Sequence, residues 1–213
     1  MDFSLLATIA LYAVPVVFAI TLHEAAHGYV ARIFGDQTAW MLGRVTLNPL
    51  KHIDPVGTVL VPISLLLLSK LMGGGGFLFG WAKPVPVNFG NLRHPKRDML
   101  WVAAAGPAAN FAMALAWAFV AKYSTSEGVD VMASAGVITN VVLMVLNLLP
   151  ILPLDGGRIA VSLLPHRLAL SYARFEPYGF MVIILLLATG ALNVLMAPFV
   201  SFFLTFFGAL AGG

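Results

Sequence analysis

The first apolar stretch of the chain carries three ionisable residues within five positions, in the sequence His23-Glu24-Ala25-Ala26-His27. On a helix, residues four apart lie on one face, so both imidazoles can point toward one metal ion. Glu24 then lies beside the ion, where its carboxylate can accept a proton from water that the metal activates. This HExxH spacing is typical of zinc proteases and predicts a metal-dependent hydrolytic site.

The composition places this stretch in a membrane. Of 213 residues, 60% are hydrophobic and only 10% are charged, against about 25% charged residues in soluble domains. These values exclude an ordinary cytosolic enzyme, a disordered chain and a nucleic-acid-binding protein. The chain has no Cys, so His, Asp or Glu must hold any transition metal.

The alternative interpretation of the HExxH sequence is a chance match in which the histidines are hydrogen-bonded core residues. A charged residue at the centre of a membrane helix costs at least about 2.5–3.5 kcal/mol, and a bound metal offsets that cost by coordination. Three ionisable groups in one membrane helix therefore favour a metal site over a chance match.

Two histidines leave a catalytic zinc one protein ligand short of the usual three. Asp155 is the candidate third ligand, because it follows an apolar segment in LPLDGGR, where prolines break the helix and Gly156-Gly157 allow close backbone approach. The alternative is that Asp155 caps a helix beginning at Gly156. The remaining histidines lie beside basic residues or proline in predicted loops and are expected at the surface: His52, His94 and His166.

Three amide side chains also fall within apolar segments: Asn110 in GPAAN, and Asn140 and Asn147 in the following segment. Hydrogen bonding between helices is one interpretation. The other is a polar wall that binds a substrate backbone or steadies a metal ligand. Asn147 precedes Asp155 by about two helical turns and could face the same cavity.

The elements that position these residues are apolar segments long enough to cross a ~30 Å hydrocarbon core. The sequence predicts one all-α polytopic membrane domain, residues 1–213, with about four to six transmembrane helices and a short re-entrant or β-hairpin element. A weak alternation around Met41 to Leu47 could form a strand pair. The expected spans are 3–31, 99–121, 131–150 and 178–197, with a re-entrant or additional span at 56–82 and an apolar tail at 199–211.

Basic residues flank the short apolar run 56–71 on both sides, as Arg44 and Lys51 before it and Lys83 and Arg93 after it. The positive-inside rule places both flanks in the cytoplasm, which favours re-entry over a full crossing. The N-terminus is then outside, and the HExxH site lies toward the cytoplasmic side.

Three ordered motifs, HEAAH, GPAAN and NLLPILPLDGG, together with FGWAKPVPVN, resemble the site-2 protease family, in its small prokaryotic branch. The resemblance implies an intramembrane zinc metalloprotease with one Zn²⁺ per chain, held by His23, His27 and Asp155, and with Glu24 as general base. It also implies that Asn147 and Pro150 line the site or hold the substrate strand, and that the region from Phe77 to Asn88 is a re-entrant β element that guides substrate.

The chain departs from the family pattern where Leu152 stands in place of a frequent Pro, and it has no inserted PDZ-like or CBS-like domain. The expected function is hydrolysis of a peptide bond in or near a transmembrane segment, in regulated intramembrane proteolysis at a prokaryotic cell membrane. The expected partners are single-span membrane proteins, the bilayer and a further copy of the chain, with no nucleic acid. The alternatives are a transporter or ion-binding membrane protein, which would need more acidic groups at depth than Glu24 and Asp155, and an inactive scaffold of the same family.

Overall fold

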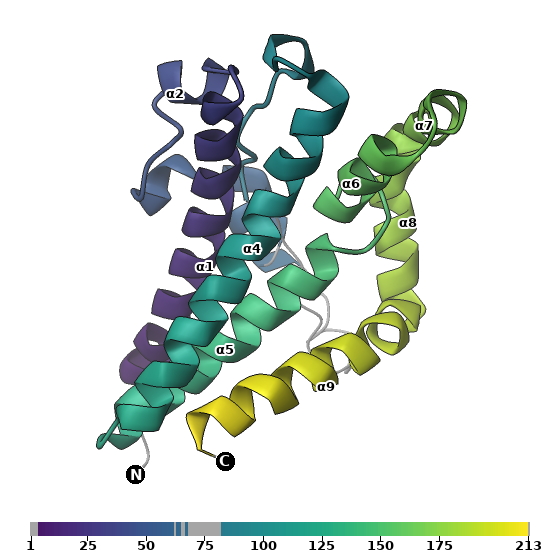
Figure 1. Ribbon diagram of the computed structural model, residues 1–213. Helices are drawn as coiled ribbons and strands as arrows, with labels where there is room; N and C mark the ends of the chain where they lie inside the picture. The colour runs from purple at the N-terminus through teal and green to yellow at the C-terminus, as the bar shows by residue number, and fades with distance from the viewer. Residues whose placement is uncertain (1–3, 62, 65–66, 68–81, 213) are drawn as a thin grey trace.

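The computed structural model of the protein describes residues 4–61, 63–64, 67 and 82–212 (Figure 1). These residues form helices and connecting turns without a strand, so the expected all-α polytopic class is confirmed. The helices are α1 (Leu5–Ile33), α2 (Thr38–Met41), α4 (Pro95–Tyr123), α5 (Glu127–Asn147), α6 (Asp155–Leu163), α7 (His166–Ala173), α8 (Glu176–Ala188) and α9 (Ala191–Ala211). Shorter helical turns are η1 (Pro49–Lys51), η2 (Pro55–Leu60) and η3 (Phe89–Asn91).

Four helices of the described residues are long and apolar enough to cross a membrane: Ala10–Ile33 within α1, α4, α5 and α9. The pair α7 and α8, bent by 63°, would make a fifth span if it crosses as one broken helix. Because a span of about 20 residues at 1.5 Å per residue matches the hydrocarbon thickness, each of the four can cross alone.

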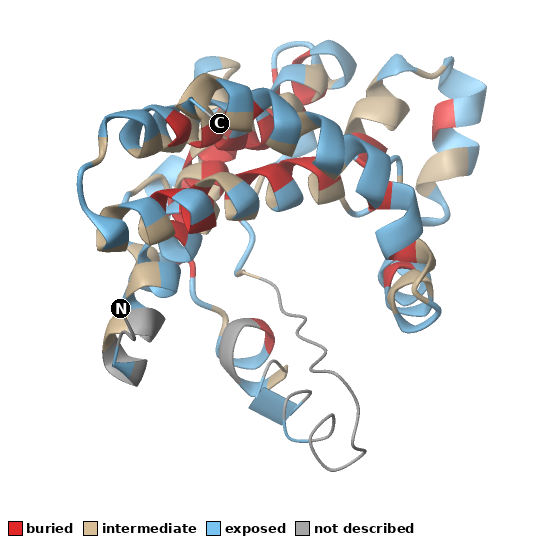
Figure 2. Cartoon of the chain, turned by 90° about the horizontal axis from the view of Figure 1, so that it is seen from below, coloured by how far each residue is buried: buried red, intermediate tan, exposed pale blue. Residues whose placement is uncertain are grey.

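The centre of the fold is α4, which packs on α1, α5, α6 and α9. In Figure 1, α1, α4 and α5 run alongside one another, and α9 lies across the lower part of the view. Among the described residues, the larger of two buried clusters joins α4, α5 and α9 through residues such as Ala114, Val141, Met144, Leu192 and Phe207. Figure 2 shows that the buried positions lie where these helices face each other. Small side chains on α4 permit this close packing, as in other membrane bundles.

Two sequence predictions about local structure are wrong. The strand pair expected around Met41 to Leu47 is absent, because the chain closes back on α2: the Arg44 N–H group donates to the Ala39 carbonyl at 2.9 Å, and Gly43 turns with φ +62°. The span expected at 178–197 is not one helix, because α8 ends at Ala188 and Gly190, with φ +74°, starts α9 in a new direction.

The remaining predictions concern 56–82 and 77–88, which the structure describes only in part, and 199–211, which it describes in full. The prediction of re-entry at 56–82 lies mostly outside the described residues, and so does the first part of the expected β element at 77–88. Residues 82–88 are described and lie in no strand. The apolar tail at 199–211 is part of α9 and packs against α4 and α5.

Candidate metal centre

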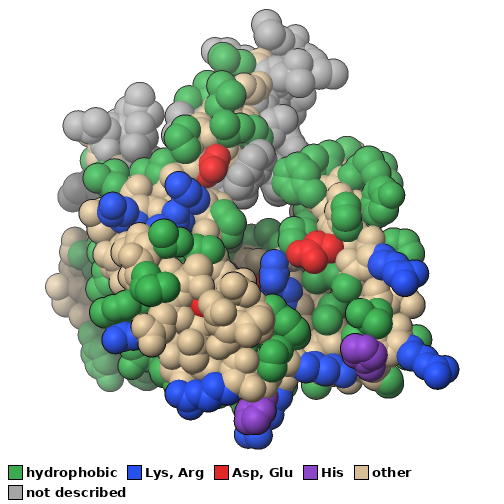
Figure 3. Space-filling view, turned by 90° about the horizontal axis from the view of Figure 1, so that it is seen from above, with side chains coloured by type: hydrophobic (Ala, Val, Ile, Leu, Met, Phe, Trp, Pro, Cys, Tyr) green, Lys and Arg blue, Asp and Glu red, His purple; other side chains and the backbone are tan. Residues whose placement is uncertain are grey.

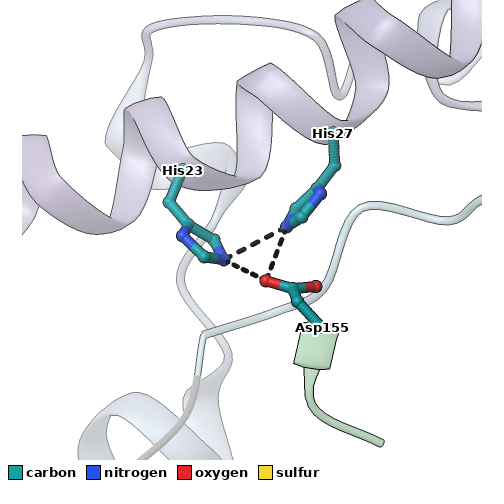
Figure 4. A group of neighbouring side chains, drawn as sticks. All are labelled: His23, His27 and Asp155. Carbon is teal, nitrogen blue, oxygen red and sulfur yellow. Dashed lines mark hydrogen bonds and ion pairs between the residues drawn. The ribbon is translucent and has the colours of Figure 1, made fainter. Parts of the chain in front are cut away.

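Three side chains from two distant parts of the chain meet at the buried side of α1 (Figure 4). The Nε2 atoms of His23 and His27 lie 3.1 Å apart. Asp155 Oδ2 lies 3.2 Å from Nε2 of His23 and 3.3 Å from Nε2 of His27. All three residues are at most 9% exposed. The structure thus brings together the three residues that the sequence predicts as metal ligands.

Asp155 reaches this position as the first residue of α6, directly after the turn that follows α5. It is not the N-cap, since Leu154 occupies that position and no side-chain capping bond is formed, so the capping interpretation is wrong. The following glycines let this turn fold tightly. A Cβ atom on Gly156 would overlap the Leu148 carbonyl, and one on Gly157 would lie 2.5 Å from the Leu152 nitrogen.

The hydrogen bonds behind the imidazoles fix the atoms that face Asp155. Nδ1 of His27 donates to the Val102 carbonyl at 2.7 Å, because a carbonyl can only accept. Nδ1 of His23 lies 2.6 Å from Asn110 Oδ1, and the Asn110 amide nitrogen donates to Asn140 Oδ1 at 2.9 Å and to the Ala19 carbonyl at 3.3 Å. The Asn110 oxygen is therefore the acceptor, and both histidines carry their proton on Nδ1.

This protonation leaves three acceptor atoms facing one another when the imidazoles are neutral. Both Nε2 atoms then present lone pairs, and Asp155 Oδ2 is a buried oxygen with no hydrogen-bond partner. Converging lone pairs in a buried site repel unless a cation lies between them. Zinc bonds of about 2.0–2.2 Å at tetrahedral angles separate ligand atoms by roughly 3.3 Å, which matches the distances found here. The donor set therefore fits a zinc ion.

Gly106 of α4 provides the room for the two imidazoles. A Cβ atom at this position would stand 2.6 Å from Cε1 of His23 and closer still to Nε2 of His27. No side chain other than hydrogen fits there without moving a histidine. The GPAAN sequence thus contributes both this close approach and the amide of Asn110, four residues later on the same face of α4.

Glu24, between the two histidines in the sequence, is held by a different segment of the chain. Its carboxylate Oε2 accepts a hydrogen bond of 2.7 Å from the Val85 N–H group. The side chain is half-buried, unlike those of the two histidines. Neither this backbone donor nor the Val102 carbonyl behind His27 was predicted, because every non-proline residue carries the same backbone groups and no sequence pattern marks one of them.

The other predicted site residues lie at different places. Asn140 joins the network behind His23 through Asn110 and donates to the Gly136 carbonyl at 2.8 Å. Asn147 is half-buried and donates to the Leu143 carbonyl of its own helix at 2.9 Å. Pro150 is exposed, and its carbonyl accepts from the Tyr172 hydroxyl. Within the described chain, no hydrogen bond joins Asn147 or Pro150 to the three candidate ligands.

The prediction of surface positions for the remaining histidines is wrong for one of them. His52 is 2% exposed, and its ring Nε2 lies 3.0 Å from the Thr46 carbonyl. The loop that carries it folds inward, held by this ring contact and by the hydrogen bond from the Lys83 N–H group to the His52 carbonyl. His94 and His166 are exposed.

Comparisons of the sequence with known proteins all find peptidases. The sequence model of peptidase family M50 matches residues 122–190, a range that includes Asp155. Two similar proteins carry the name "putative zinc metalloprotease". YwhC of Bacillus subtilis is 36% identical over 195 residues, which are 87% of this chain and 83% of YwhC. Rip2 of Mycolicibacterium smegmatis is 32% identical over 194 residues, which are 89% of this chain and 71% of Rip2. No solved structure gives a significant match.

Proposed function

Because the chain belongs to peptidase family M50, the family of the site-2 proteases, and is a multi-pass membrane protein, we propose that it is a zinc-dependent intramembrane endopeptidase. The observation that carries the proposal is the group of three acceptor atoms formed by His23, His27 and Asp155 within 3.3 Å of one another. The substrates are single-span membrane proteins, cleaved within or near the transmembrane segment in regulated intramembrane proteolysis.

The residues divide the chemistry between them. His23, His27 and Asp155 would hold one zinc ion, which supplies Lewis-acid chemistry that acidifies water and polarises a peptide carbonyl. Asn110 and Val102 hold the two imidazoles so that Nε2 faces the ion. Glu24 takes the proton from the attacking water and later delivers it to the leaving amine. One carboxylate thus serves first as general base and then as general acid.

Substrate contact is assigned to the end of α5. Asn147 is half-buried and Pro150 is exposed, so a substrate segment can reach both of them. Both residues also lie within eight positions of Asp155 in the sequence. A transmembrane helix hides its carbonyls in its own hydrogen bonds, and must therefore unwind before its peptide bond can be attacked.

The distribution of charge supports a cell-membrane orientation with the site toward the cytoplasm. Figure 3, seen from the end of the molecule that carries α2 and the start of α4, shows Lys and Arg side chains gathered on this face. Exposed basic residues in the last turn of α1, just before α4 and at the start of α4 are Arg32, Arg93, Lys96 and Arg97. The positive-inside rule makes this the cytoplasmic face, and His23 and His27 lie in the half of α1 nearer to it.

The test is cleavage of a membrane-spanning reporter by the purified protein, with zinc content measured on the same sample. Glu24→Gln keeps the three candidate ligands and removes the base, so we expect zinc to be retained and cleavage to fall by about 10²–10⁴-fold. Normal cleavage by this variant contradicts the mechanism. Absence of cleavage in the native protein with zinc bound favours the inactive-scaffold alternative, and metal transport without cleavage favours the transporter.

A further inference from the structure

Residues 82–88, Ala-Lys-Pro-Val-Pro-Val-Asn, form a segment without helix or strand, called here the proline segment. Its Val85 is the residue whose N–H group donates to Glu24 Oε2 at 2.7 Å, and the Val85 side chain is only 7% exposed. A buried backbone donor bonded to the carboxylate of the proposed general base suggests that the segment acts on that carboxylate.

The two prolines make Val85 a special donor. Pro84 and Pro86 have no N–H group, so Val85 carries the sole backbone donor in this stretch of three residues. Lys83 and Val85 each precede a proline, which disfavours helical backbone at both positions. The sequence K-P-V-P thus presents one N–H group on a stiff, non-helical support.

Contacts other than Glu24 hold the proline segment in place. At its start, the Lys83 N–H group donates to the His52 carbonyl at 2.9 Å, and the buried Arg44 guanidinium donates to the Lys83 carbonyl at 2.8 Å. At its end, the Asn88 N–H group donates to Asp36 Oδ2 at 2.6 Å. Since both ends are held independently, the segment sets the position of Val85, and Glu24 adjusts to it.

The Asp36 anchor is itself firmly built. Its carboxylate is fully buried and accepts further hydrogen bonds from the Thr38 N–H group, the Thr38 hydroxyl and the Asn91 amide. Burial opposes ionisation, but the bonds from Thr38, Asn88 and Asn91 outweigh it and hold the pKa of Asp36 below its ordinary value. The anchor therefore remains charged at neutral pH.

Gly28 allows the proline segment to approach α1 closely. It lies four residues after Glu24, hence on the same face of the helix. A Cβ atom at Gly28 would meet Val85 Cγ1 at 3.0 Å and Val45 Cγ2 at 2.7 Å. The final residue of the HEAAHG sequence thus leaves the space through which Val85 comes within hydrogen-bonding distance of Glu24.

We propose that the Val85 N–H group is a positioning element for catalysis, which holds Oε2 of Glu24 and thereby directs Oε1 toward the proton of the attacking water. The inference rests on the proposed function, in which Glu24 is the general base. A carboxylate is planar, so fixing one oxygen by a charge-assisted hydrogen bond fixes the direction of the other. The proline segment then acts on the turnover of bound substrate and has no part in holding the metal.

The experiment removes one N–H group and keeps the side chain. Replacing Val85 by its α-hydroxy analogue, incorporated in the full chain, converts the amide donor into an ester oxygen. We expect kcat to fall by about tenfold or more, since orientation accounts for part of the 10²–10⁴-fold contribution of a general base, while KM and zinc content stay unchanged. The matched control is the same replacement at Val87, whose side chain packs on the cluster of Ala31, Leu92, Met99 and Val102.

A second measurement needs neither metal nor turnover. The chain has three glutamates, Glu24, Glu127 and Glu176, so ¹³C-glutamate labelling gives a simple infrared carboxylate band, in which the Glu24→Gln difference identifies Glu24. We expect the ester at Val85 to shift the Glu24 band in zinc-free protein, and the ester at Val87 to leave it in place.

Each result bears on the proposal. The proposal is supported if the ester at Val85 lowers kcat and shifts the Glu24 band, and the ester at Val87 does neither. Unchanged kcat at position 85, an equal loss with both esters, or loss of zinc with the ester at Val85 overturns it. Normal cleavage by Glu24→Gln contradicts the proposed function itself, so the two failures are distinguishable.

Discussion

The two sides of the candidate site are built differently. The metal side consists of His23, His27 and Asp155, and the base side consists of Glu24. The three candidate ligands project from α1 and α6, and their supporting groups belong to α4. Glu24 is supported by the proline segment, which has no regular secondary structure. The metal side thus depends on helix packing, whereas the base side depends on a loop anchored by a few hydrogen bonds.

Both sides use α1 in the same way. Gly106 lets α4 approach the face with the two histidines, and Gly28 lets Val85 approach the face with Glu24. One helix therefore presents ligands to a neighbouring helix and a base to a loop, about 100° apart around its axis. This division predicts that substitutions on the metal side change zinc binding, and that substitutions on the base side change turnover alone.

Removal of a candidate ligand should have the largest effect. Asp155→Ala leaves the two imidazoles without the anionic member of the candidate ligand group. Loss of a supporting group lowers metal affinity by about 10–100-fold, and loss of a ligand should lower zinc affinity further. Zinc titration of purified protein measures this, and reporter cleavage should disappear with the metal. Asp130→Ala, at an exposed position in the first turn of α5, is the control. Unchanged zinc affinity in Asp155→Ala removes Asp155 from the site.

Gly106→Ala tests the packing on the metal side. The added methyl group would overlap the imidazoles of His23 and His27, so we expect zinc affinity to fall by about a hundredfold, as for a disrupted ligand shell. Gly208→Ala is the matched control, because Gly208 lies in α9 with no atom within 4 Å of an added Cβ. Equal zinc affinity in both variants would show that the helices shift without cost to the site.

Asn110→Ala tests the hydrogen bond behind His23. The imidazole loses the acceptor that keeps its proton on Nδ1, and we expect about a tenfold loss of zinc affinity. Asn110→Asp retains an acceptor and should restore part of this loss, whereas Asn193→Ala, on an exposed position of α9, should have no effect. A loss that Asp does not restore assigns Asn110 to helix packing alone.

The metal side could largely be predicted from the sequence, because its signal is a spacing. Residues four apart on a helix share a face whatever surrounds them, and this places His23 beside His27. Asp155 was predictable because a carboxylate beside prolines and glycines at the end of an apolar segment is uncommon. Gly106 of GPAAN could not be assigned to the site from the sequence, because its contact with the two imidazoles depends on the rotation of α4 about its axis.

The base side and the break between α8 and α9 could not be predicted in the same way. Val85 acts through its backbone, and its neighbours in K-P-V-P indicate only a non-helical segment. The run 178–197 is strongly apolar apart from Thr189 and Asn193, so its hydrophobicity predicts one continuous span. The turn at Gly190 is marked only by the pair Thr189-Gly190. Membrane segments lack the polar and apolar alternation that locates element ends in soluble domains.

Gly28→Ala should have the smallest effect, and it tests whether the two sides are separable. The added methyl group lies 2.7 Å from Val45 Cγ2, so the Val45 side chain must shift. It also lies 3.0 Å from Val85 Cγ1, so the proline segment must give by a few tenths of an ångström. Because misplacement of a catalytic group by about 1 Å can cost about 10²-fold, a smaller shift should lower kcat by about two- to fivefold. Zinc affinity should stay at the native value, in contrast to Gly106→Ala. A parallel loss of zinc in Gly28→Ala would mean that α1 moves as a whole, and that the metal and base sides of the site cannot be changed independently.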